Sequence, residues 1–171
     1  MTPAIWSRLD VIARRLLPAA LTAALVLAAA LPLHSTAARA MAPSLPLIAV
    51  FFWTLYRPDL MPAVAVFVIG LLWDVFAGLP IGIGATVLVG VHAIATLQRS
   101  FFNGKSFTVL WLGFAVLAAA ALILCWLMTC LYYVTLITPA RVLFQIVTTV
   151  GVFPILCWLL VRCQGLLPEQ T

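Results

Sequence analysis

The chain has 171 residues, of which 66% are hydrophobic and only 8% are charged. Soluble domains are about half apolar and about one quarter charged, so side chains of this composition cannot cover a surface in water. This excludes an ordinary soluble domain and predicts an all-α, polytopic membrane protein. Because one crossing needs about 20 apolar residues, the chain predicts a single transmembrane domain, a bundle of about six helices.

Apolar runs follow one another along the chain and are separated by residues that end helices, such as Pro58 and Gly78-Leu79-Pro80. The predicted spans are residues 16–33, 42–56, 60–77, 81–97, 107–137 and 142–161. The first run could instead be a signal peptide, since residues 38–40 read Ala-Arg-Ala. Its 18 residues exceed the usual signal core of about 7–15, so we predict an uncleaved first helix.

The net charge of +5 does not indicate nucleic-acid binding, because the basic residues stand singly between apolar runs. Such residues orient helices, with the larger number on the cytoplasmic side. With all the predicted spans crossing and a cytoplasmic N-terminus, seven of the nine basic residues lie inside and two, Arg39 and Arg141, lie outside. If the short run 42–56 does not cross, this bias is lost. The charges therefore predict a multi-pass protein with both termini in the cytoplasm.

Asp74 is the one charged residue in the apolar stretch 60–97. A carboxylate in hydrocarbon is costly, so such residues usually pair, face a wet cavity or take part in a mechanism. Gly70, Asp74 and Gly78 are four residues apart and are predicted to share one helical face that another helix approaches closely. We favour a structural contact between helices over proton relay, because no second acid lies in another predicted span.

Two further stripes of small residues indicate helix packing. Gly82, Thr86 and Gly90 predict that the spans 60–77 and 81–97 form a tight hairpin. A stripe on the first span predicts packing within the bundle or docking of a partner helix. It consists of Ala20, Ala24 and Ala28.

No arrangement of catalytic or metal-ligating residues is apparent. His92 stands alone in its span and is interpreted as a hydrogen-bonded interior residue, and the four cysteines form no CxxC pair. Residues 80–90 are rich in glycine, but no strand precedes them and no GK[ST] follows, so a nucleotide loop is rejected. The sequence predicts no enzyme, no cofactor and no metal site.

The segment around Asp74 carries a resemblance to a known family. Pro58 follows the second span, and the core Gly70-Leu71-Leu72-Trp73-Asp74-Val75-Phe76-Ala77-Gly78-Leu79-Pro80-Ile81-Gly82 comes next. This segment resembles the rod shape-determining MreD family, which shows a G-L-x-x-D-x-x-x-G-x-P-x-G core. The positions that match are Gly70, Leu71, Asp74, Gly78, Pro80 and Gly82.

The resemblance implies a six-transmembrane-helix fold similar to the substrate-capture subunits of energy-coupling-factor vitamin transporters. It implies a non-catalytic subunit of the bacterial inner membrane that works in the rod complex, or elongasome. There it would help control cell shape and lateral peptidoglycan synthesis by scaffolding. The implied partners are MreC and, indirectly, the MreB filament, the RodA polymerase and a penicillin-binding transpeptidase. Structural or interaction roles are implied for Gly70, Asp74, Gly78, Pro80, Gly82 and Pro58.

A vitamin-transporter capture subunit is the alternative. The stripe of Ala20, Ala24 and Ala28 favours it, because that family docks its membrane partner through small residues on the first helix. The small number of polar side chains on the predicted periplasmic side argues against it, since a vitamin needs polar contacts.

Overall fold

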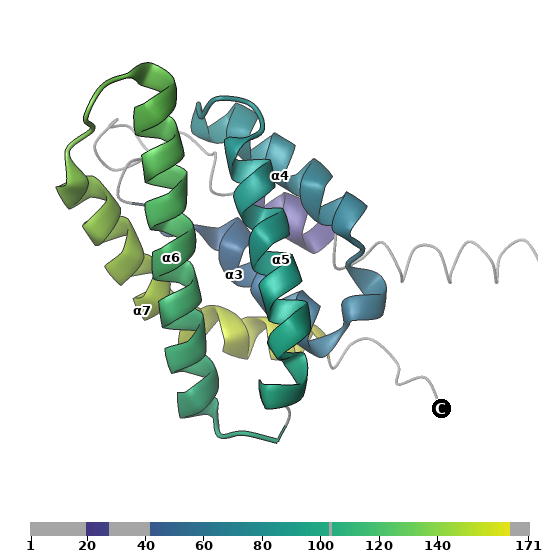
Figure 1. Cartoon of the computed structure of the whole chain (residues 1–171). Helices are drawn as coiled ribbons and strands as arrows, with labels where there is room; N and C mark the ends of the chain where they lie inside the picture. Colours follow the sequence, from purple (N-terminus) through teal and green to yellow (C-terminus); the bar gives the residue numbers. More distant parts are fainter. Residues whose placement is uncertain (1–19, 28–41, 103, 165–171) are drawn as a thin grey trace, which may run out of the picture.

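The computed structural model describes residues 20–27, 42–102 and 104–164, and every regular element among them is helical. Residues 20–27 form a helical segment, while the remainder of the predicted first span lies outside the described residues. The elements that follow are α3 (Leu45–Tyr56), η1 (Pro58–Leu60), α4 (Ala63–Ala77), α5 (Ile83–Phe102), α6 (Phe107–Tyr133) and α7 (Pro139–Gln164). Of these, α5, α6 and α7 are long and apolar enough to cross a membrane (Figure 1).

The short helix α3 lies in the middle of the bundle and contacts α4, α5 and α7. All of its residues from 46 to 55 are buried, as expected of a helix that is apolar on every side. At 1.5 Å per residue its 12 residues extend only about 18 Å, against about 30 Å of hydrocarbon. The predicted second span is therefore a short helix enclosed by its neighbours. That α3 alone bridges the bilayer stays a prediction.

A cluster of aromatic rings joins α3 to the three long helices. The ring of Phe51 in α3 lies 6.3 Å from Phe102, 5.1 Å from Phe114 and 6.0 Å from Phe153 between centroids. Phe114 and Phe153 also stack on one another, with centroids 4.0 Å apart. Because each ring comes from a different helix, this cluster fixes how α3, α5, α6 and α7 pack.

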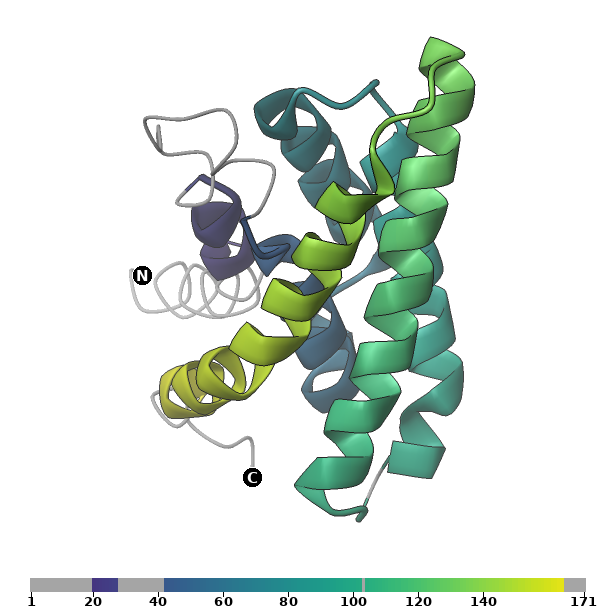
Figure 2. The same ribbon diagram turned by 90° about the vertical axis from the view of Figure 1, so that its left-hand side faces the viewer.

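The helix α7 contains Pro154 and changes direction along its length. Figures 1 and 2 show its last part, in yellow, turning away from the direction of its first part. Proline has no N–H, so the carbonyl of Val150 loses its helical donor. The indole Nε1–H of Trp111 in α6 donates to that carbonyl at 3.0 Å. A neighbouring helix therefore satisfies the group that the proline leaves without a partner, as membrane interiors require.

The outer surface of the described helices is largely apolar. Val64, Val116, Leu131, Val147 and Ile155 are each at least two thirds exposed. So many exposed large apolar side chains are unusual on a soluble monomer. The surface is therefore suited to contact with lipid.

Several helices begin or end at other residues than the sequence predicted. Helix α4 starts at Ala63 instead of 60, because Pro62 and the 3-10 turn precede it. Helix α5 continues to Phe102, five residues beyond 97, and includes the polar residues 98–100. Helix α6 stops at Tyr133 because Val134 adopts the left-handed conformation, with φ of 50°. Pro139 is the first residue of α7, where its missing N–H costs no helical bond.

Candidate functional site

The turn between α4 and α5 is shaped by two glycines on either side of Pro80. Gly78 ends α4 in the left-handed conformation, with φ of 70° and ψ of 28°, and Gly82 has φ of 102°. These conformations are strained for any residue with a Cβ. The N–H groups of Gly78 and Leu79 both donate to the carbonyl of Asp74, so the end of α4 is closed. The turn lies at the same end of the bundle as the α6–α7 connection, at the top of Figure 1.

The side chain of Asp74 reaches from α4 to the first residues of α5. Its Oδ2 accepts from the N–H of Gly82 at 2.8 Å and of Ala85 at 3.3 Å, and its Oδ1 accepts from the N–H of Gly84 at 2.7 Å. The first N–H groups of a helix have no partner within it and carry partial positive charge. Asp74 is fully buried, and its carboxylate is stabilised by these donors. It therefore caps the neighbouring helix.

Close approach of the two backbones makes this contact possible. A Cβ at Gly84 would overlap the carboxylate of Asp74 and the ring of Trp73. A Cβ at Gly70 would overlap the backbone of Ala85. The joint between α4 and α5 thus consists of Gly70 and Asp74 on one helix and Gly84 and Ala85 on the other. We call these four residues the hairpin joint.

The structure corrects two sequence-based predictions here. Gly78 does not share the contact face with Gly70 and Asp74, because α4 ends before it and a Cβ at Gly78 would meet nothing within 4 Å. Of the stripe that begins at Gly82, only Gly82 itself meets Asp74, through its backbone N–H. Thr86 is exposed, and a Cβ at Gly90 would also meet nothing within 4 Å. Residues two apart on a helix are rotated by about 200°, so Thr86 lies opposite Gly84.

Two other predicted elements lie away from the joint. Pro58 begins η1, and its carbonyl accepts from the N–H of Met61 at 3.1 Å. Helix α4 separates it from the turn by about 22 Å, so Pro58 shapes the opposite end of the hairpin. On the first predicted span, Ala20 and Ala24 are exposed while Thr22 and Val26 are buried, and Ala28 lies outside the described residues.

A second polar contact, which is part-buried, links α3 to α5. The hydroxyl of Thr54 donates to the carbonyl of Val50 at 2.7 Å and lies 2.8 Å from His92 Nδ1. Because its proton is used in the first bond, the hydroxyl accepts from Nδ1–H of His92. His92 is thus hydrogen-bonded, as its sequence context predicted, but it is only half-buried. Its partner Thr54 was not predicted, because nothing in the sequence relates two residues in different helices.

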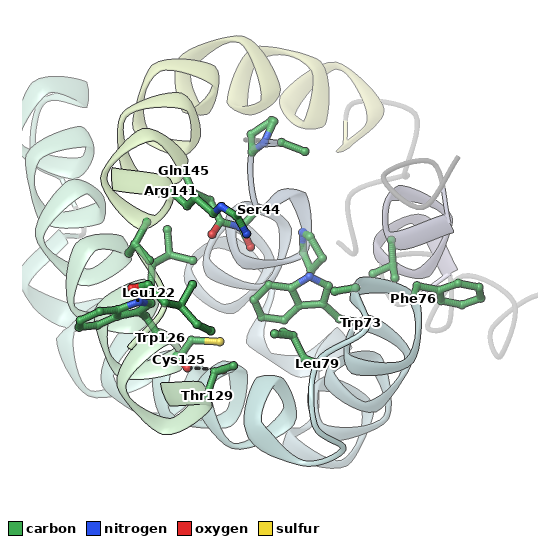
Figure 3. Close-up of a pocket in the computed structure, with 17 residues that line it drawn as sticks. Ser44, Trp73, Phe76, Leu79, Leu122, Cys125, Trp126, Thr129, Arg141 and Gln145 are labelled. Carbon is green, nitrogen blue, oxygen red and sulfur yellow. Dashed lines mark hydrogen bonds between the residues drawn. The ribbon is translucent and has the colours of Figure 1, made fainter. Parts of the chain in front are cut away.

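A cavity of about 360 Å³ lies between α3, α4, α6 and α7, near the α4–α5 turn (Figure 3). Its walls include Trp73, Leu122 and Trp126, and its polar lining includes Ser44 and Arg141. No sequence signal brings these residues together. Among the residues that the structure describes, no group of three or more His, Cys, Asp or Glu side chains could hold a metal ion.

Comparison with known proteins identifies the family. A family model described as rod shape-determining protein MreD matches residues 11–163. No curated protein matches the chain, and no solved structure matches it. The vitamin-transporter alternative therefore has no support, and the likeness of fold to capture subunits stays a prediction. Because the match covers most of the sequence, the chain belongs to the MreD family of cell-shape-related membrane proteins.

Proposed function

We propose that this chain is a non-catalytic subunit of the rod complex in the bacterial inner membrane. It scaffolds MreC and, through it, the wall-synthesis enzymes, and so helps control cell shape and lateral peptidoglycan synthesis. Family membership supports a role in cell shape. In this proposal the chain binds MreC directly. It is linked indirectly to the MreB filament, the RodA polymerase and a penicillin-binding transpeptidase.

The main support for a scaffolding role is that Asp74 links two helices. Both of its carboxylate oxygens accept hydrogen bonds from the backbone of α5, and the side chain is fully buried. Both oxygens are thus directed at backbone groups of this chain, which stabilises the start of α5. The residue most suggestive of chemistry in the sequence is therefore engaged in fixing two helices, which favours a structural role for the segment around it.

The proposed topology has about six crossings and both termini in the cytoplasm. The α4–α5 turn and the α6–α7 connection then lie on the periplasmic side, and the loop between α5 and α6 lies in the cytoplasm. This agrees with Figure 1, where the first two connections lie at one end of the bundle and the third at the other. A periplasmic end rich in backbone turns gives an MreC-like partner a defined surface.

The test is crosslinking in living cells, followed by pull-down of the tagged full chain in mild detergent and mass-spectrometric identification of its partners. Recovery of MreC and wall-synthesis enzymes is the expected result. Recovery of a membrane coupling protein with ATPases, or of no component of the rod complex, would overturn the proposal. A tagged membrane protein of unrelated function, expressed at the same level, is the control for non-specific capture.

A further inference from the structure

The cavity at the α4–α5 turn has a size and lining suited to a ligand. Its volume of about 360 Å³ falls within the range of small-molecule sites, roughly 300–1,000 Å³. Trp73, Leu122 and Trp126 give it apolar walls, and Figure 3 shows the first and last on opposite sides of the space. The indole Nε1–H of Trp126 donates to the carbonyl of Ile137 at 3.1 Å, which fixes its ring in place.

Ser44 supplies a buried polar group without a partner at the edge of this cavity. The residue is only 2% exposed, and its Oγ has no hydrogen-bond partner among the described residues. Its own N–H donates to Thr149 Oγ1 at 3.0 Å, and that hydroxyl donates to the carbonyl of Gln145 at 2.6 Å. Ser44 is therefore held rigidly against α7. A buried hydroxyl without a partner is unfavourable, and a ligand oxygen in the cavity would satisfy it.

Arg141 brings a positive charge to the same wall. It lies one helical turn before Gln145 on α7, and both side chains line the cavity beside Ser44 (Figure 3). The guanidinium makes no hydrogen bond or ion pair with any residue that the structure describes. The carboxylate of Asp74 is occupied by the backbone of α5 and does not compensate it. A guanidinium and a hydroxyl without partners together suit an anion, and phosphate in particular.

The surroundings indicate that the anion belongs to a lipid. The cavity lies at the end of the bundle, where headgroups meet the ends of spanning helices. Beside it, the apolar residues Val75, Leu143 and Phe144 of α4 and α7 are exposed along the sides that would face acyl chains. An amphiphile can place its phosphate in the cavity while its chains follow these surfaces.

We propose that this cavity binds the headgroup of an anionic phospholipid. The phosphate oxygens accept hydrogen bonds from Arg141 and Ser44, and the glycerol carbons lie against Leu122 and Trp126. The site does not depend on the scaffolding role, since its ligand is recognised by this chain alone.

The test is native mass spectrometry of the delipidated full chain, titrated with dioleoyl phosphatidylglycerol and with dioleoyl phosphatidylcholine. We expect the anionic lipid to bind about tenfold more tightly, because its net charge is not cancelled within the headgroup. Arg141→Gln should bring the ratio of the two lipid affinities close to one. Ser44→Ala should weaken binding of the anionic lipid about threefold. Arg162→Gln, at the other end of α7, is the matched control and should leave the preference unchanged.

Three outcomes would overturn the proposal. One is equal binding of the two lipids, and another is an equal loss of preference in the Arg162→Gln and Arg141→Gln variants. The third is displacement of the lipid by millimolar glycerol 3-phosphate, which would assign the cavity to a soluble anion. A further variant, Ala77→Phe, removes no polar group but fills part of the cavity, because Ala77 is an exposed residue of its lining. It should abolish the tighter binding, and retention of that binding would also contradict the proposal.

Discussion

The two helical hairpins of this molecule meet the same physical requirement by different means. At the α4–α5 hairpin, a carboxylate accepts from the N–H groups that begin the second helix. At the α6–α7 hairpin, two indoles donate to backbone carbonyls. Trp126 donates to Ile137 in the connection, and Trp111 donates to Val150, four residues before Pro154. In both hairpins, side chains of the first helix satisfy backbone groups that the second helix or the connection leaves open. In hydrocarbon no water can replace them.

The difference between the hairpins is one of distance. Glycines bring α4 and α5 so close that a single short carboxylate spans the gap. The pair α6 and α7 lacks such glycine contacts at its bridging residues, and the long indole of Trp111 spans the gap instead. Substitutions in the hairpin joint between α4 and α5 should therefore be the most destabilising.

Asp74→Leu should have the largest effect. It removes the acceptor for three backbone N–H groups without opening a large cavity. Since each buried donor left without a partner costs about 1–3 kcal/mol, the variant should lose about 3 kcal/mol or more of stability. Thermal unfolding in detergent measures this, and capture of MreC should fall in parallel. Gln98→Leu, at an exposed position of α5, is the control and should leave both unchanged. A melting temperature of Asp74→Leu equal to that of the unchanged protein would show that the carboxylate does not hold the hairpin.

Gly84→Ala and Gly90→Ala form a matched pair on one helix. The first places a methyl group against Asp74 and Trp73 and should destabilise the protein by about 1–3 kcal/mol, as overpacking does. The second meets open space and should be neutral, or stabilising by up to about 1 kcal/mol, because alanine favours helix. Unfolding temperatures measured in the same detergent compare them. The reverse order would show that the stripe of Gly82, Thr86 and Gly90 is the packing face after all.

Trp111→Phe tests the second hairpin. It removes the donor to the carbonyl of Val150 and should destabilise by about 1–2 kcal/mol. In a Pro154→Ala background the residue at position 154 regains an N–H, so the same change should cost much less. A double-mutant cycle of unfolding free energies measures the coupling. Additive effects of the two substitutions would mean that the indole does not compensate for the proline.

Val134→Gly should have the smallest effect. Val134 is 91% exposed and has a left-handed backbone, so its side chain adds strain and little packing. Glycine removes that strain and should stabilise the protein by about 1 kcal/mol. Val134→Ala keeps a Cβ and serves as the control, with a smaller gain. Destabilisation by glycine would indicate that the side chain of Val134 makes a contact that holds the α6–α7 connection.

The sequence allowed some of these features to be predicted. The membrane class follows from composition, because no soluble fold can be built from so few polar residues. Asp74 attracted attention because a carboxylate in an apolar run is costly, and its role as a link between helices was expected. Spacing by four could not reveal that α4 ends before Gly78, since a helix face and a helix end can carry the same residues.

Other features need the third dimension. An apolar helix reads the same whether it faces lipid or other helices, so the enclosure of α3 was invisible in the sequence. The face of α5 that contacts α4 depends on the rotation of the helix after the turn, and small residues occur on both faces. Ser44, Trp126 and Arg141 are far apart in the chain, and their approach around one cavity depends on how α3, α6 and α7 pack.

The enclosure of α3 also has a consequence for biosynthesis. The ribosome releases α3 before α5, α6 and α7 exist, yet its contacts with α5 and α7 complete its surroundings. Until α7 is made, the side of α3 that α7 covers must be shielded by lipid or by the insertion machinery. The hydrogen bond from Ser44 to Thr149 and the edge-to-face contact of Phe51 with Phe153 can form only at that late stage. Assembly of the core therefore waits for the last described helix, and a chain that stops before α7 leaves its central helix uncovered.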